Sequence, residues 1–136
     1  MQVAVRLILE EGLAHRFRRH EVAAAALRAG VQGMGLEMFP DPSIWSNTVS
    51  SIRAPQDVST AAVVARMRDQ YGILIGTGLD KIRTTTLRIG TMGLTASPQY
   101  VLPTLGALEL TLRDLGYKCE PGAGIVAAQR IFADNP

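Results

Sequence analysis

The chain has 136 residues, which suits one ordinary domain that is long enough to bury a hydrophobic core. Its 47% of hydrophobic and 19% of charged residues indicate a globular protein and exclude a disordered chain. Fourteen basic and twelve acidic residues leave a net charge of +2, and the basic residues are scattered along the sequence, so a nucleic-acid partner is not expected.

The sequence also gives little support for a membrane, disulfide or metal site. No apolar run approaches the length that crosses a bilayer. Cys119 is the single cysteine, which excludes an internal disulfide and a cysteine-based metal cage. His15 and His20 are five residues apart rather than four, so they do not share a helix face suited to a metal ion. We therefore expect a cytoplasmic protein without a metal, and no signal-peptide pattern precedes the first helix.

Residues 1–33 predict a long helical region. Apolar residues recur at helical intervals from Leu9 to Val31, with charged residues between them. Gly12 is a possible break, and the glycines at 30, 33 and 35 are expected to end the helix. The pattern begins within a few residues of Met1 without a capping side chain, which favours a truncated helix or one that needs an absent partner.

The middle of the chain predicts strands around a second helix. Residues 48–53 alternate and are rich in β-branched types, which is typical of a strand. A helix over 60–71 follows, capped by Asp57 or Ser59 and stopped by Gly72. The elements expected next are a short strand over 73–75, a turn over 76–81 and a strand over 84–89.

Two further helices complete the predicted order. Ser97 as N-cap and Pro98 as first helical residue begin a helix whose apolar stripe runs to Leu115, and Gly116 ends it. A last helix is expected over 125–132. Short connections between these elements favour one α+β domain, with a small antiparallel or mixed sheet and helices packed on one face.

Arg88 is the candidate binding residue. Leu87 and Ile89 point to one face of the predicted strand, so Arg88 points to the other, just before a glycine-rich exit. A guanidinium on a stiff strand is suited to hold a planar carboxylate with two parallel hydrogen bonds. An arginine on the solvated face of a sheet is the commoner reading, and spacing alone favours it.

Other candidates for chemistry are weaker. The glycines at 76, 78, 90 and 93 fit either turns or close approach to a ligand. Lys81 lies in a predicted turn and Lys118 just after a helix, so both are expected to be exposed and charged, which does not suit a Schiff-base amine. No Ser-His-Asp set can be assembled, and we assign no catalytic residue to this chain.

Three segments together carry a resemblance to a known family. They are 48–52, then 72–79, then Arg88-Ile89-Gly90-Thr91-Met92-Gly93 with its preceding leucine and a helix after Ser97. In this order they resemble the C-terminal small domain of class V aminotransferases, nearest to the alanine–glyoxylate and serine–pyruvate branch. The resemblance covers nearly the whole chain, and the Arg-Ile-Gly-x-Met-Gly motif is its most specific part.

The resemblance implies a substrate site without a cofactor site. Enzymes of this family carry pyridoxal phosphate on a lysine of a large N-terminal domain and work as homodimers. The arginine of the motif binds the α-carboxylate of the amino or keto acid, which assigns that role to Arg88. Residues 1–136 then form a single C-terminal small domain, with 1–33 as the long connecting helix region. The lysine, the ring-nitrogen carboxylate and the phosphate site are absent, so the chain alone is expected to be inactive.

The whole enzyme is expected to transfer an amino group from a small amino acid, such as alanine or serine, to glyoxylate or pyruvate. Two alternatives remain open from the residues. The chain is otherwise a stand-alone α+β module that binds a small acid without chemistry, or a dimerisation module that uses the apolar face of its first helix.

Overall fold

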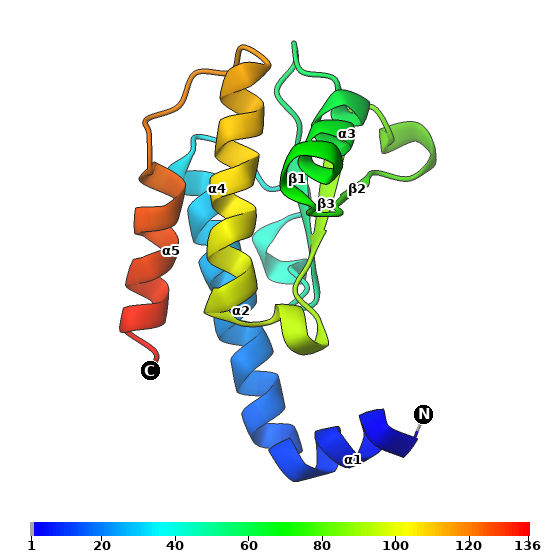
Figure 1. Cartoon of the computed structure of the whole chain (residues 1–136), viewed down its shortest axis with the longest axis vertical. Helices are drawn as coiled ribbons and strands as arrows, with labels where there is room; N and C mark the ends of the chain where they lie inside the picture. The colour runs from blue at the N-terminus through cyan, green and yellow to red at the C-terminus, as the bar shows by residue number, and fades with distance from the viewer. Residues whose placement is uncertain (1) are drawn as a thin grey trace.

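The computed structural model describes residues 2–136, and within them it contains five α-helices and one three-stranded sheet (Figure 1). The helices are α1 (Gln2–Glu11), α2 (Leu13–Gly33), α3 (Thr60–Tyr71), α4 (Pro98–Asp114) and α5 (Ala123–Ala133). The strands are β1 (Val49–Arg53), β2 (Gly76–Thr77) and β3 (Thr86–Gly90). Single 3-10 turns lie at η1 (Pro42–Ile44), η2 (Asp80–Ile82) and η3 (Gly93–Thr95).

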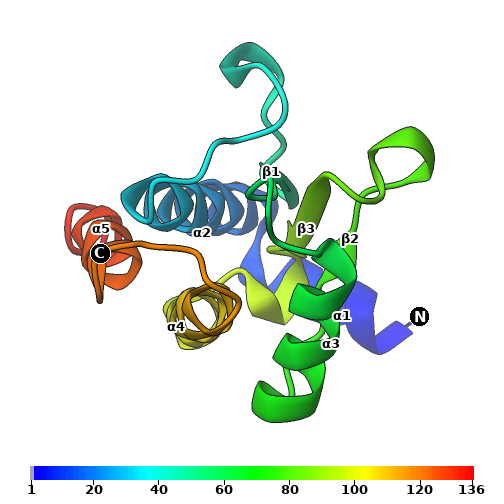
Figure 2. The ribbon, with the colours of Figure 1, turned by 90° about the horizontal axis from the view of Figure 1, so that it is seen from above.

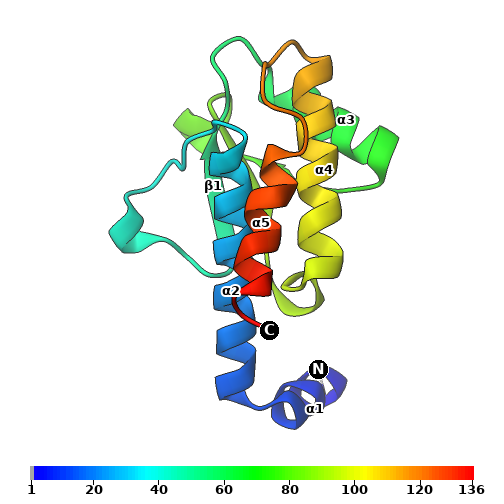
Figure 3. The same cartoon turned by 90° about the vertical axis from the view of Figure 1, so that its left-hand side faces the viewer.

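The predicted N-terminal helical region is two helices joined by a sharp bend at Gly12. Gly12 has a φ of 79°, a left-handed conformation that a side chain would strain. The predicted break is therefore confirmed. As a result α1 projects away from the body of the molecule, at the end opposite to the tops of α3 and α4 (Figure 3).

The sheet has the order β1-β3-β2, and both pairs are antiparallel. This confirms the predicted α+β fold and settles the sheet as antiparallel. Helices α2, α3 and α4 cover one face of the sheet, and α5 packs outside α2 and α4 (Figure 2). Within residues 2–136, the other face of the sheet carries no α-helix.

The hydrophobic core lies between the sheet and its three covering helices. From the sheet, Ile52, Leu87 and Ile89 point toward the helices and are at most 4% exposed. The helices contribute apolar side chains at the predicted periodic positions. These include Leu27 and Val31 of α2, Val63 and Met67 of α3, and Val101, Leu105, Leu108 and Leu112 of α4.

Most predicted helix ends are confirmed, with one difference in capping. The Ser59 side chain accepts a hydrogen bond from the Ala62 backbone N–H, so Ser59 rather than Asp57 is the cap of α3. Gly72 ends that helix with a φ of 66°. Ser97 is the N-cap residue of α4, but its hydroxyl donates to the Leu94 carbonyl instead of capping the helix.

The strand predicted over 73–75 is wrong. The Ile73 backbone N–H closes α3 by donating to the Met67 carbonyl, and the Leu74 side chain is 77% exposed. Pairing with β3 starts only at Gly76, which faces Arg88 across the ladder. The apolar run at 73–75 suggested a strand, but which residues pair in a sheet also depends on the partner strand.

The predicted turn over 76–81 and strand over 84–89 are shifted for the same reason. Gly76–Thr77 is a strand, and the turn is closed by η2, where the Thr85 backbone N–H donates to the Ile82 carbonyl. The strand then runs over Thr86–Gly90. Gly78 makes the tight turn possible, because a Cβ atom there would overlap the Ile82 carbonyl.

Candidate functional site

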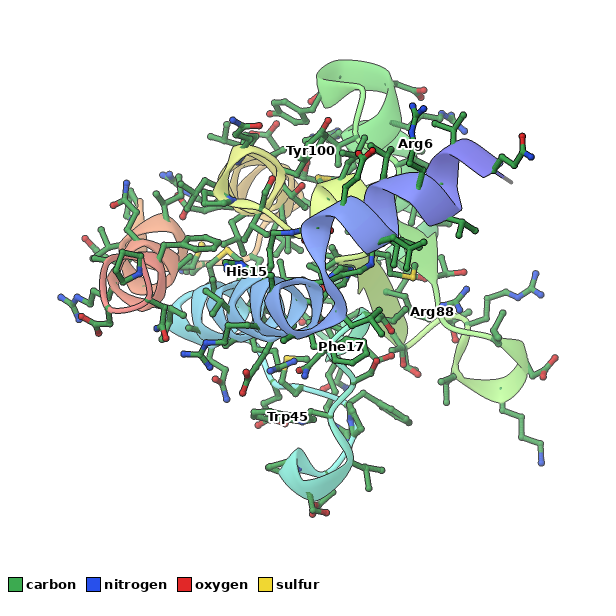
Figure 4. The ribbon with its side chains drawn as sticks, turned by 90° about the horizontal axis from the view of Figure 1, so that it is seen from below. Arg6, His15, Phe17, Trp45, Arg88 and Tyr100 are labelled. Atoms are coloured by element: carbon green, nitrogen blue, oxygen red, sulfur yellow. The ribbon has the colours of Figure 1, made fainter. Side chains whose placement is uncertain are left out.

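Arg88 lies at the centre of the sheet on the face that carries no helix. It is the middle residue of β3, with Ser51 of β1 on one side and Gly76 of β2 on the other. Its neighbours Leu87 and Ile89 are buried against the helices, so the strand period sends the Arg88 side chain to the opposite face. The predicted orientation is confirmed, and Figure 4 shows Arg88 on the side of β3 away from α3 and α4.

The backbone of β2 fixes the guanidinium of Arg88. Its Nε donates to the Thr77 carbonyl at 2.8 Å, and the side chain is half-buried. Gly76 leaves the room for this contact, since a Cβ atom there would lie 3.5 Å from Nη2 of Arg88. The two terminal nitrogens, Nη1 and Nη2, keep the fork geometry that matches the two oxygens of a carboxylate.

Arg88 has no acidic partner within residues 2–136. No Asp or Glu oxygen of this part of the chain lies within 4.0 Å of its guanidinium. Arg53 is a useful contrast because it lies on the same face of the sheet, opposite Thr86. Its Nε is 3.8 Å from Glu37 Oε2, and its guanidinium stacks 4.9 Å above the Phe39 ring. Arg53 is thus paired within the chain, and Arg88 is left available for an anionic ligand.

Two hollows of residues 2–136 lie away from Arg88. One hollow, of about 260 Å³, lies between the residues after α3, the end of β3 and the start of α4. A second, of about 570 Å³, lies between α2, the start of α4 and the C-terminal residues. Arg88 lines neither of them, and its side chain is half-buried.

The two lysines do not form a cofactor site. Lys81 lies in η2 and Lys118 follows α4, and both side chains are exposed, as predicted. Neither lines either of the two hollows described above. A Schiff-base lysine needs a desolvated pocket that lowers its pKa, so these residues do not fit pyridoxal phosphate.

The described residues hold neither a metal cluster nor a membrane-spanning helix. Over 2–136, no three His, Cys, Asp or Glu side chains lie together as a metal site would require. No helix of this part combines the length and apolar character that a bilayer span needs.

Sequence reasoning missed two features, one at Arg88 and one beside the loop that follows β3. The Thr77 carbonyl gives no sequence signal, because every residue has one and only the pairing of β2 with β3 selects it. The second is a polar cluster of Glu11, Arg16, Arg19 and His20 beside the loop after β3.

Comparisons with known proteins place the chain among aminotransferases. No family model matches it. It is 34% identical to an uncharacterized aminotransferase of Methanocaldococcus jannaschii over 132 residues, which are 97% of this chain and 34% of that protein. The chain therefore spans about a third of the length of the curated relatives it matches.

Solved structures give the same result. The ureidoglycine–glyoxylate aminotransferase of Bacillus subtilis superposes with a TM-score of 0.92 and 36% identity, over 95% of this chain and 33% of that one. The pyridoxamine–pyruvate aminotransferase of Mesorhizobium loti superposes with a TM-score of 0.94 and 36% identity, over 98% of this chain and 34% of that one. In sequence and in fold, the chain thus belongs with the class V pyridoxal-phosphate-dependent aminotransferases, to one third of whose length it corresponds.

Proposed function

We propose that residues 1–136 are the C-terminal small domain of a pyridoxal-phosphate-dependent aminotransferase, with 1–33 as its connecting helix region. The enzyme would be a cytoplasmic homodimer that transfers the amino group of a small amino acid, such as alanine or serine, to glyoxylate or pyruvate. Relatives named for glyoxylate and for pyruvate support this acceptor class. The cofactor, held outside this chain, would supply the electron sink for the reaction.

The role proposed for this chain is to bind and orient the substrate carboxylate through Arg88. The observation that carries the proposal is a half-buried guanidinium held by the Thr77 carbonyl, with no carboxylate partner in residues 2–136. A fixed fork sets which way the α-carbon of the substrate faces, so Arg88 contributes orientation as well as affinity. No proton transfer is assigned to it.

Exposed apolar side chains at the N-terminal end support a larger assembly. Val3, Leu9 and Phe17 are 62%, 71% and 66% exposed, and α1 has no buried residue. Apolar surface gathered at one end of a molecule is typical of an interface. We propose that the rest of the enzyme or its partner subunit covers these side chains. The same surface also favours the second candidate function, a dimerisation module without catalysis.

Replacing Arg88 by lysine in the complete enzyme tests the proposal. We expect kcat/KM for the amino acid to fall by at least about tenfold, because an ammonium cannot form the two parallel hydrogen bonds. Steady-state kinetics measures this, with Arg53→Lys as the matched control on the same face of the sheet. The visible absorbance of the bound cofactor should not change. Equal kinetics for Arg88→Lys and Arg53→Lys would return Arg88 to a surface role.

The isolated chain should not transaminate. Mixed with pyridoxal phosphate, alanine and glyoxylate, it should form no glycine, because its two lysines are exposed and fit no cofactor pocket. Amino-acid analysis of the mixture checks this. Turnover by the chain alone would show that a site within residues 1–136 supports the cofactor chemistry.

A further inference from the structure

A polar cluster braces the bend between α1 and α2. Glu11, the last residue of α1, accepts hydrogen bonds from Arg19 at both carboxylate oxygens, Oε1 from Nε at 2.7 Å and Oε2 from Nη2 at 3.0 Å. Arg16 Nη1 adds a third hydrogen bond at 2.9 Å. The two arginines hold the pKa of Glu11 down to about 2, chiefly through the hydrogen bonds from Arg19. The charged form of Glu11 therefore holds α1 in its bent position across Gly12.

The same arginine also holds the segment that follows β3. We call residues 91–97 the β3–α4 loop. Arg19 Nη1 donates to the carbonyls of Gly93 at 2.7 Å and Ala96 at 2.9 Å. Nε and Nη2 of Arg19 therefore bind Glu11, and Nη1 binds the loop. The rigid guanidinium thus connects the two.

His20 completes the grip on Gly93. The Gly93 backbone N–H donates to Nε2 of His20 at 3.0 Å. A backbone N–H can only donate, so Nε2 accepts and Nδ1 carries the proton, which it donates to the Arg16 carbonyl at 2.7 Å. Both backbone polar groups of Gly93 are thus bound by neighbouring residues of α2. Gly93 itself has a φ of 60°, a conformation in which a side chain would be strained.

We propose that Glu11, Arg19 and His20 are positioning residues that make the α1–α2 bend and the β3–α4 loop move as one unit. The loop begins one residue after the strand that carries Arg88, and it lies at the same end of the molecule as α1 (Figure 1). A displacement of α1 would move Glu11, and with it Arg19. Because Arg19 binds the β3–α4 loop, the displacement would also reach the end of β3. The consequence of this coupling rests on the proposed function. These three side chains would fix the position of Arg88 relative to the part of the enzyme that packs against α1.

Amide hydrogen exchange on the 136-residue chain tests this coupling without any turnover. The variant is Glu11→Gln, which keeps the side-chain shape and removes the charge that holds Arg19. We expect the Gly93 amide to exchange about tenfold faster, although Glu11 does not contact the loop. The Gly78 amide, which donates to the Thr86 carbonyl at the other end of β3, is the internal reference and should not change.

The matched control is Arg18→Gln, the neighbouring residue on α2. Arg18 is exposed and pairs with Glu21 and Asn135 instead of the loop. It should leave Gly93 exchange unchanged. If Glu11→Gln also leaves it unchanged, the bend and the loop are independent and the inference is overturned.

Two substitutions of His20 separate the hydrogen bond from mere packing. The amide oxygen of His20→Gln reaches the place of Nε2 and accepts from Gly93, so protection should be kept. His20→Asn reaches only the place of Nδ1, so protection should be lost. Equal exchange in the two variants would remove His20 from the positioning set. Because no arm needs catalysis, these outcomes are distinct from a failure of the Arg88→Lys test.

Discussion

At the scale of single residues, three arginines make the hydrogen bonds that matter most for the proposals above. Arg88 is held by a backbone carbonyl and has no acidic partner within residues 2–136. Arg19 is fully committed to Glu11 and two loop carbonyls. Arg28, 8% exposed, donates to the Ser46 carbonyl and lies 5.1 Å from the centre of the Trp45 ring. Arginine thus has three roles here, set by its partners: Arg88 is proposed to bind a ligand, Arg19 links Glu11 to the loop after β3, and Arg28 holds the loop at Ser46.

The carboxylate of Glu11 predicts a loss of stability in acid. Its pKa is lowered in the folded protein to about 2 from an ordinary 4.5, so its stabilising effect is complete above about pH 4.5. That stabilisation is lost as the pH falls from there through about 2. Glu11→Gln should be less stable than the unchanged chain at pH 7 and should show a shallower acid loss. Urea unfolding at several pH values measures the difference, and parallel curves would contradict it.

At the scale of elements, two glycines set the closeness of α2 and α5. A Cβ atom on Gly30 would lie 2.9 Å from the Gly124 carbonyl oxygen and would also overlap the Leu105 side chain. A Cβ atom on Gly124 would lie 3.0 Å from the Gly30 carbonyl oxygen. The two helices therefore touch backbone to backbone, and small residues are required on both.

Gly30→Ala should destabilise the chain by about 1–3 kcal/mol, because overpacking here pushes backbone against backbone. Gly106 in α4 is the matched control, since its added Cβ atom would meet only Ile125 Cδ1, at 3.4 Å. Gly106→Ala should be neutral or stabilise by up to about 1 kcal/mol through its higher helix propensity. Thermal unfolding of both variants checks the contrast. Equal melting temperatures would show that α5 shifts freely on α2.

At the scale of the whole molecule, most elements share a buried core, whereas α1 at the N-terminal end buries no residue. The sheet, α2 beyond its first turns, α3, α4 and α5 share one core. By contrast, α1 has no buried residue, and most of its large apolar side chains are exposed. We therefore expect the folding of the body to depend little on the exposed apolar side chains of α1.

Replacing Val5 and Leu9 together by glutamine should separate stability from association. These side chains are 49% and 71% exposed, so the free energy of unfolding should change by no more than about 0.5 kcal/mol. Self-association of the isolated chain should fall, as analytical ultracentrifugation over a concentration series would show. A large loss of stability would mean that α1 packs on the body.

The local elements of this protein were determined by its sequence alone. Helical periodicity, Ser59 and Gly72 placed α3, Gly12 placed the bend, and Leu87 and Ile89 placed Arg88 on the open face. These features depend on residues a few positions apart, so they can be read without the fold. The resemblance to class V aminotransferases was likewise visible in the order of its segments.

Only the tertiary structure decided which strand edge pairs with β3 and what holds Arg88 and the loop after it. The apolar run at 73–75 suggested a strand, but the ladder uses Gly76 and Thr77, and the Thr77 carbonyl thereby meets Arg88. Glu11 and Gly93 are linked through Arg19 although they are far apart in sequence. Strand register and ion pairs arise from contacts between distant segments, and local patterns do not encode which distant groups will meet.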